Sequence, residues 1–186
     1  MVSQRNKTIH LTDLDRMELR PLLLQATEVN ESNCLNSTIL GDTFCVLPKL
    51  AAQIADLAIV DPPYNLYKKV GDLTFGKRSI SAYTDWLMSL LAILKPTLKP
   101  TATVYLCGDW VSSPSLYEAG IRSGLIPRNR ITWSRKSPGA QRNWKNAHED
   151  VWYFTCSRNF TYNVVKTRKK VLFPYKHEAA DWTLDP

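Results

Sequence analysis

The sequence predicts an α/β protein in which crossover helices connect the strands of a sheet. Short apolar runs typical of buried strands alternate with stretches of helical periodicity. Several of these runs end abruptly in polar turns. The order strand, helix, strand, helix, strand is the pattern of crossover connections. With 186 residues, 44% of them hydrophobic and 22% charged, the chain is long enough for one domain with a substantial core.

The first third of the chain is expected to lead into a central strand. Residues 1–35 read as a polar N-terminal extension, and residues 39–42 as a short strand that runs into a turn. A helix is predicted over 43–54, with Pro48 interrupting it. The continuous apolar run 57–60 predicts a strand that is buried on both faces.

The middle of the chain contains the strongest helical signal. Residues 66–80 are polar and basic, which predicts a mobile loop. Apolar residues then recur at helical spacing through 83–94, and this helix is expected to stop at Lys95-Pro96. The run 103–107 predicts the next buried strand, which Gly108-Asp109 closes.

A second helix and two further strands complete the pattern. Ser113 is the predicted N-cap of the helix, Pro114 its first residue and Gly124 its stop. The β-rich runs 130–134 and 151–155 lie on either side of a basic loop.

The composition argues against several classes of protein and site. Residues 1–10 are polar, which predicts no signal peptide, and no apolar stretch is long enough to span a bilayer. We therefore expect a cytoplasmic protein without membrane contact. The cysteines show no CxxC spacing and the histidines do not pair with them, so we expect reduced thiols and no metal site.

The charge is concentrated in the last third of the chain. Residues 1–120 contain 11 basic and 12 acidic side chains, whereas residues 121–186 contain 13 basic and 5 acidic ones. This asymmetry suggests a polyanionic partner such as nucleic acid, although a solvated basic surface would explain it equally well. Within the basic loop, polar amides are interleaved with the charges, which favours phosphate and base contacts. The residues assigned to these contacts are Arg135, Lys136, Arg142 and Asn146.

The most informative stretch is VDPPYN, residues 60–65. In open α/β sheets, ligands bind outside the carboxyl ends of the strands, which is where this turn lies. Pro62 and Pro63 remove backbone donors, so carbonyl oxygens become the main polar features of the turn. Together with the carboxylate of Asp61 they form a group of acceptors beside the ring of Tyr64.

An exocyclic amino group on a nucleobase matches this arrangement, because it offers two N–H donors on a flat ring. Asp61 and the Pro62 carbonyl could draw the nitrogen toward tetrahedral geometry and stabilise the positive charge that develops as it attacks an electrophilic methyl group. Tyr64 could stack on the ring. The base must first leave the duplex, because its amino group is otherwise paired.

On these residues the chain resembles the DNA amino-methyltransferases, which use S-adenosylmethionine to methylate adenine N6 or cytosine N4. The likeness is strongest to the group with a permuted motif order, in which the DPPY segment comes early. It runs from about Ile39 to Tyr175. The matching segments are Ile39-Leu40-Gly41-Asp42, residues 56–65, Leu94-Lys95-Pro96 with Val104-Tyr105-Leu106, Ile131-Thr132-Trp133-Ser134, and residues 146–154.

The resemblance implies roles for individual residues. It makes Asp61 to Tyr64 the catalytic turn and places Asp42 beside the cofactor together with Asp61. Asn65 and His148 are assigned to the substrate, with the segment around His148-Glu149 beside the flipped base. From the residues alone, Gly41-Asp42 could equally be an ordinary turn and His148 a structural histidine.

The resemblance also implies a Rossmann-like class I methyltransferase sheet, and one that is incomplete in this chain. The strands leading to Asp42, Asp61 and Asp109 are expected to lie in one sheet, with S-adenosylmethionine across their carboxyl ends. The family's glycine-rich cofactor loop is missing, since none of the seven glycines falls in a G-x-G arrangement. The chain is therefore expected to be truncated, one half of a split enzyme, or a degenerate fragment. Alone the chain should bind the cofactor poorly. It should associate with a copy of itself or with a complementary second chain. Without such a partner, Leu57 and Ile59 are expected to be exposed.

Residues 36–160 are expected to form the catalytic core and residues 161–186 the start of a target-recognition region. Double-stranded DNA is the expected partner and adenine N6 the expected acceptor, because Asp61 occupies the first position of the turn. Cytosine N4 and a non-catalytic nucleic-acid-binding subunit remain alternatives. RNA or a glutamine side chain in a protein is a weaker option for the substrate, because related turns also occur in enzymes that methylate those substrates.

Overall fold

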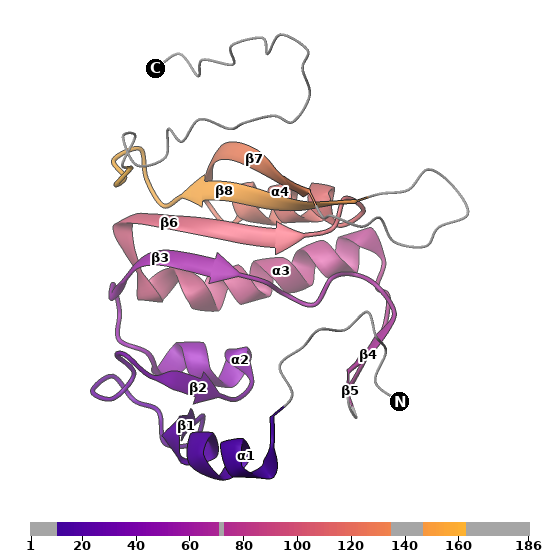
Figure 1. The fold of residues 1–186 in the computed structure, drawn as a ribbon. Helices are drawn as coiled ribbons and strands as arrows, with labels where there is room; N and C mark the ends of the chain where they lie inside the picture. Colours follow the sequence, from indigo (N-terminus) through magenta and orange to yellow (C-terminus); the bar gives the residue numbers. More distant parts are fainter. Residues whose placement is uncertain (1–10, 71–72, 135–146, 163–186) are drawn as a thin grey trace, which may run out of the picture.

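The computed structural model describes residues 11–70, 73–134 and 147–162, and its central feature is a four-stranded sheet (Figure 1). The strands lie in the order β3-β6-β8-β7. Their bounds are β3 Ala55–Val60, β6 Leu98–Gly108, β7 Ile126–Ser134 and β8 His148–Thr155. The four strands predicted for this sheet are thus present, and each is longer than its predicted run.

The sheet is mixed because its last strand inserts between two others. β3 runs parallel to β6, with Ala58 opposite Val104. β8 pairs antiparallel with both β6 and β7, and its Tyr153 lies opposite Tyr105. Because β8 runs opposite to β3 and β6, its beginning lies at the edge of the sheet where those two strands end.

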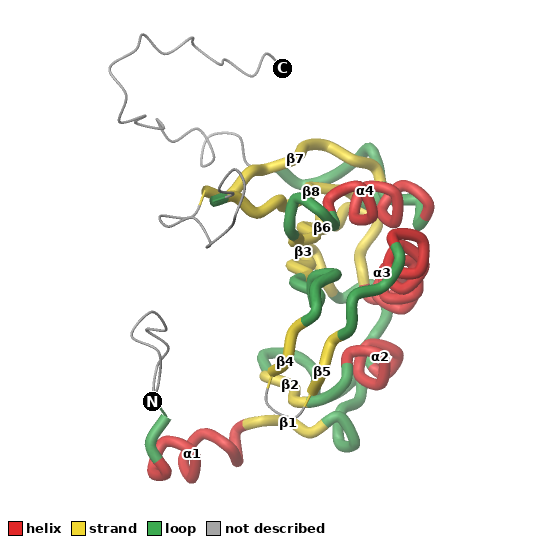
Figure 2. Tube along the Cα trace, turned by 90° about the vertical axis from the view of Figure 1, so that its right-hand side faces the viewer, coloured by secondary structure: helices red, strands yellow, loops and turns green. Residues whose placement is uncertain are grey.

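Two helices connect the strands and cover one face of the sheet (Figure 2). α3 (Ile80–Leu94) joins β3 to β6, and α4 (Ser113–Arg122) joins β6 to β7. The periodicity over 83–94 predicted α3 correctly, since its apolar positions are the buried ones. These side chains form one core with the strands: Tyr83, Leu87, Leu91, Leu94, Leu98, Ala102, Val104, Leu106, Leu116, Ala119, Leu125 and Phe154.

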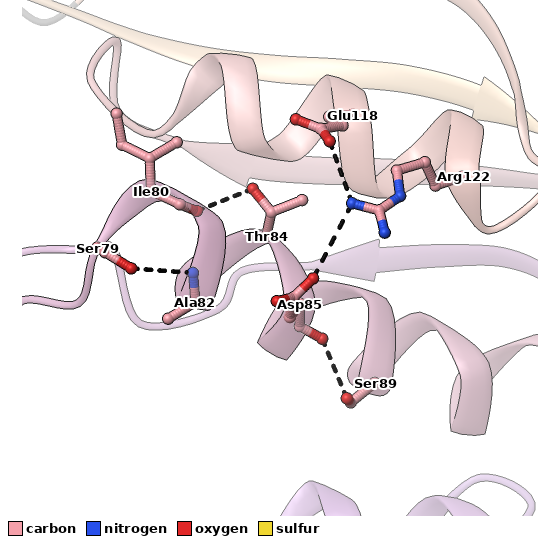
Figure 3. Close-up of polar contacts among 8 residues, drawn as sticks. All are labelled: Ser79, Ile80, Ala82, Thr84, Asp85, Ser89, Glu118 and Arg122. Carbon is pink, nitrogen blue, oxygen red and sulfur yellow. Dashed lines mark hydrogen bonds and ion pairs between the residues drawn. The ribbon is translucent and has the colours of Figure 1, made fainter.

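A hydrogen-bonded cap begins α3, and a cluster of charged side chains lies between α3 and α4 (Figure 3). The Ser79 hydroxyl accepts a hydrogen bond from the Ala82 amide, which caps the beginning of α3. On α4, the Arg122 guanidinium lies 3.1 Å from Glu118 and 3.9 Å from Asp85 of α3. These charges are about half exposed, so their contribution to stability is small.

The start of α4 differs from the prediction. Its N-cap is Ser112, whose side chain makes no capping bond, and Ser113 is the first helical residue. The Ser113 hydroxyl instead accepts a hydrogen bond from the indole N–H of Trp152, at 2.9 Å. A contact with β8 therefore replaces the expected local cap. The predicted stop at Gly124 is consistent with its φ of +75°, which favours glycine.

A smaller unit precedes the main sheet. β1 (Leu23–Gln25) and β2 (Thr38–Leu40) form a parallel pair of their own, after α1 (Asp13–Leu19). The prediction that the strand before Asp42 belongs to the main sheet is therefore wrong. The helix predicted over 43–54 is also too long, because α2 (Thr43–Val46) gives way to a 3₁₀ turn at Leu47–Lys49, where Pro48 cannot continue an α-helix.

The segment 66–80 contains more regular structure than the predicted loop. β4 (Lys68–Val70) and β5 (Leu73–Phe75) form an antiparallel pair. Polar composition concealed this hairpin, because its strands are too short for an alternating pattern to stand out.

β3 is the edge strand of the four-stranded sheet, which corrects the prediction that it is buried on both faces. Ala58 and Val60 pack against the core below α3. On the opposite face, Leu57 is 51% exposed and Ile59 is 71% exposed. The expected exposure of these two side chains is confirmed, and Figure 2 shows no described helix on this face.

Candidate active site

The candidate site lies at the edge of the main sheet where two strands end and a third begins. β3 ends at Val60 and leads directly into Asp61, and β6 ends at Gly108, immediately before Asp109. The antiparallel β8 begins at the same edge, with His148 and Glu149. Carboxyl ends of parallel strands are where ligands bind in open α/β sheets, so the fold places the DPPY turn at the expected edge.

The acceptors of the turn fall into two groups. The Pro63 carbonyl accepts a hydrogen bond from the Tyr83 hydroxyl at 3.0 Å, and the Tyr64 carbonyl accepts one from the Leu66 amide at 2.6 Å. Among the described residues, no hydrogen bond occupies the Pro62 carbonyl or the carboxylate of Asp61, which is exposed. The Asp61 carboxylate and the Pro62 carbonyl therefore accept no hydrogen bond from a described residue, although Pro62 itself is buried.

The Tyr64 hydroxyl is held by β8. It donates a hydrogen bond to the Glu149 carboxylate at 3.2 Å, and the side chain is partly buried. Burial raises the pKa of Tyr64 first, and the negative charges of Asp61 and Glu149 raise it further. The hydroxyl is thus a donor at any physiological pH.

Two carboxylates give the site a negative character. Burial raises the pKa of the nearby Cys107 thiol, and the charges of Asp61 and Glu149 add to this shift. Such a site disfavours a phosphate group, because like charges repel. It favours N–H donors and a group on which positive charge develops.

Asn65 lies behind the turn. It is 7% exposed, and its amide bonds the backbone of Arg78 twice, accepting from the N–H at 2.7 Å and donating to the carbonyl at 3.0 Å. Its backbone N–H also donates to the Ser112 hydroxyl at 3.4 Å. A contact between Asn65 and DNA stays a prediction, and the structure gives this residue a supporting role.

The other predicted residues are spread more widely. Asp42 caps α2 by accepting a hydrogen bond from the Phe44 amide at 2.8 Å, and its side chain is exposed. His148 is exposed at the start of β8. Four predicted DNA contacts lie outside the described residues: Arg135, Lys136, Arg142 and Asn146.

Sequence reasoning missed two residues that border the site. Tyr83 was read only as a core position of α3, and Cys107 only as part of a strand. The one signal for Tyr83 is its hydroxyl, which a purely apolar position would not need. In the part of the chain that the structure describes, no group of three or more potential metal ligands is close enough to hold an ion, and no helix is long and apolar enough to cross a membrane.

Comparison with known families identifies the chain. The family model for DNA methylases that modify N6 or N4 amino groups matches residues 55–181. The chain belongs to this family. The match begins with β3 and includes the DPPY turn, α3, α4 and the last pair of strands.

Two curated relatives support the assignment. Over 164 residues the chain is 25% identical to the DNA adenine methyltransferase YhdJ of Escherichia coli, covering 78% of this chain and 55% of that protein. Over 131 residues it is 28% identical to the type II methyltransferase M.BglII of Bacillus subtilis, covering 65% of this chain and 35% of that protein. The chain thus spans about half the length, or less, of these relatives.

A solved structure shows the same fold. The PvuII DNA methyltransferase, described as cytosine-N4-specific, superposes with a TM-score of 0.59 at 18% identity, over 70% of this chain and 52% of that one. The class I methyltransferase fold predicted from the sequence is confirmed, as an incomplete Rossmann-like sheet.

Proposed function

We propose that this chain carries the catalytic turn of an S-adenosylmethionine-dependent DNA methyltransferase that modifies the amino group of a flipped base. The observation that supports this most directly is the pair of acceptors that the fold leaves free, the Asp61 carboxylate and the Pro62 carbonyl. Membership of the DNA methylase family supplies the reaction class.

The chemistry follows from what these acceptors do to an amino group. The lone pair of an exocyclic nitrogen is delocalised into the base, so the nitrogen is a poor nucleophile. Two acceptors that hold its N–H hydrogens favour tetrahedral geometry and stabilise the positive charge of the transition state. The neighbouring carboxylate of Glu149 adds to the same negative field.

The cofactor would supply an electrophilic methyl group. The described residues fit part of it, because Asp42 and Asp61 are exposed carboxylates that can accept hydrogen bonds from its amino groups. No glycine-rich loop is available in the sequence for close backbone contact. We infer that the remainder of the cofactor site comes from residues outside this sequence, in a further segment or in a second chain.

The open edge of β3 is the surface we assign to that segment or chain. Parallel sheets are normally covered on both faces, yet Leu57 and Ile59 are exposed here. A segment that adds a strand to the edge of β3 and packs a helix or loop on the uncovered face would bury both side chains. A second copy of this chain would bring no G-x-G sequence, so we favour a complementary half over a homodimer.

We propose adenine N6 as the acceptor and double-stranded DNA as the substrate, in the cytoplasm. Asp61 at the first position of the turn supports adenine, as does the likeness to an enzyme named as an adenine methyltransferase. The likeness in fold to an enzyme described as cytosine-N4-specific keeps cytosine as the alternative. The basic loop that contains Arg135, Lys136, Arg142 and Asn146 is the proposed DNA contact.

Product analysis tests this proposal. The chain, alone and with any chain that co-purifies with it, is incubated with unmethylated genomic DNA and labelled S-adenosylmethionine, and the nucleosides are analysed by mass spectrometry. N6-methyladenine is expected from the complete assembly. N4-methylcytosine alone would correct the acceptor. If every assembly binds DNA but transfers no methyl group, the chain is better explained as a non-catalytic nucleic-acid-binding subunit. The missing glycine-rich loop supports this alternative.

Light scattering and calorimetry test the partner. We expect the isolated chain to bind S-adenosylmethionine poorly and to gain affinity with a complementary chain. A monomer that binds the cofactor with a micromolar dissociation constant, about −8 kcal/mol, would overturn this part of the proposal. A homodimer with that affinity would shift the assignment to a second copy.

A further inference from the structure

The DPPY turn cannot fix its own orientation. Pro62 and Pro63 have no N–H groups, so the turn has few donors with which to bond its own carbonyls. Its internal backbone bond joins Leu66 to Tyr64, beyond the prolines. A donor from another element is therefore needed to hold the carbonyls beside Asp61 in one direction.

Tyr83 supplies that donor from the first turn of α3. Its hydroxyl donates to the Pro63 carbonyl at 3.0 Å. The ring is only 2% exposed and stacks on Trp86 with centroids 5.7 Å apart. A rigidly packed ring holds its hydroxyl in one place, so the bond fixes the Pro63 carbonyl relative to α3.

The orientation of Pro63 constrains its neighbour. Both prolines have a fixed φ, which leaves little freedom between one carbonyl and the next. With the Pro63 carbonyl held against α3, the Pro62 carbonyl, which accepts no hydrogen bond from a described residue, is kept in one orientation relative to Asp61. Loss of the Tyr83 bond would let the pair of acceptors reorient together.

A second attachment runs to the same end of α3. The Asn65 amide makes two bonds with the backbone of Arg78, immediately before the capping residue Ser79. The turn is thus tied to α3 on both sides of Tyr64. The two attachments are independent, since one uses a main-chain carbonyl of the turn and the other a side chain.

We propose that Tyr83 is a positioning residue, whose hydroxyl holds the Pro63 carbonyl so that the Asp61 carboxylate and the Pro62 carbonyl face the target amino group. This inference rests on the proposed function and deepens it. Tyr83 does not touch the base, so its effect should fall on the rate of methyl transfer and not on binding.

The test compares Tyr83→Phe with the wild type in the complete assembly. Phenylalanine keeps the ring in the core and removes only the hydroxyl. Tyr117→Phe is the matched control, because Tyr117 also carries a ring packed on a tryptophan, on α4, and its hydroxyl makes no hydrogen bond to a described residue. We expect kcat to fall about 10-fold or more in Tyr83→Phe, with the KM for S-adenosylmethionine and the DNA dissociation constant unchanged. Tyr117→Phe should match the wild type.

A second measurement does not depend on activity. With ¹³C-labelled proline and aspartate, the carbonyl signals of Pro62 and Pro63 and the carboxylate signal of Asp61 are followed by NMR. All three should shift in Tyr83→Phe and none in Tyr117→Phe. This readout separates the two ideas: if the wild type transfers no methyl group, the proposed function fails while the NMR shifts still decide the positioning role.

Two outcomes would overturn the inference. One is an unchanged kcat in a folded Tyr83→Phe protein. The other is a shift confined to Pro63, which would show that the bond exists but does not orient its neighbours. A fall in kcat accompanied by an equal rise in the DNA dissociation constant would also contradict it, because it would mean general damage to the site.

Discussion

The Tyr64 hydroxyl donates to the Glu149 carboxylate at 3.2 Å and so joins two residues that are 85 positions apart. Tyr64 follows the end of β3, and Glu149 lies at the beginning of β8. The bond crosses the end of β6, which lies between those strands. It therefore connects the DPPY turn to the beginning of β8.

Two substitutions at Tyr64 distinguish stacking by its ring from the hydrogen bond of its hydroxyl to Glu149. Tyr64→Ala should weaken the binding of an extruded base by about 1–3 kcal/mol, because stacking is lost. Tyr64→Phe keeps the ring and should lose much less. Affinity is measured with duplexes that contain a fluorescent base analogue, with and without a mismatch that eases extrusion. Equal losses in the two variants would assign the effect to the Glu149 bond and contradict stacking.

Asp61→Ala should reduce methyl transfer on the order of 10²-fold or more while leaving DNA affinity nearly intact, because the carboxylate acts on developing charge. The control is Asp56→Ala. Asp56 lies near the beginning of β3, the strand that ends just before Asp61, and it pairs with Lys99 at 2.6 Å on the exposed surface. Single-turnover rates and DNA dissociation constants are compared. Near-wild-type turnover in Asp61→Ala would remove Asp61 from the mechanism.

Arg130→Ala should destabilise the fold by about 1–3 kcal/mol, because it leaves a buried carboxylate without its charged partner. The Arg130 guanidinium lies 3.0 Å from Asp150, whose side chain is 2% exposed. The exposed pair of Arg122 and Glu118 provides the control, and Arg122→Ala should cost less than about 1 kcal/mol. Urea unfolding measures both. Similar losses would show that burial of Asp150 does not matter.

Gly120→Ala should cost about 1–3 kcal/mol, because a methyl group there would collide with the ring of Phe154 and push α4 from the sheet. The matched variant is Gly76→Ala, where the space within 4 Å is empty. Thermal unfolding distinguishes them. A stable Gly120→Ala protein would mean that Phe154 can move aside at little cost.

Stability should fall at high pH partly through Tyr83. Burial, together with the charge of Asp109, raises the pKa of Tyr83 to about 12, from about 10 in an unfolded chain. Between these values the unfolded state releases the proton and the folded state keeps it. The contribution of Tyr83 is therefore complete below about pH 10 and is lost as the pH rises toward about 12. Tyr83→Phe lacks this loss, so the difference in urea midpoint between wild type and variant should shrink across that window. A constant difference would contradict the shift.

Local patterns were enough to predict much of the fold. The repeat of apolar residues through 83–94 predicted α3, because apolar residues at helical spacing form one face that packs against a core. The DPPY turn after the apolar run 57–60 predicted a polar site at a strand end. The effects of proline and aspartate on the backbone are local, so the sequence is enough to predict them. Glycine at 124 predicted the end of α4 for the same local reason.

Long-range pairing decided the rest. Only the folded chain inserts β8 between β6 and β7 and so brings Glu149 to Tyr64. Only packing of α3 turns Tyr83 from an apolar position into the donor that holds Pro63. The strand before Asp42 pairs outside the main sheet, although its sequence resembles a sheet strand. Strand order and hydroxyl contacts depend on which distant residues meet, and a sequence pattern records only neighbours along the chain.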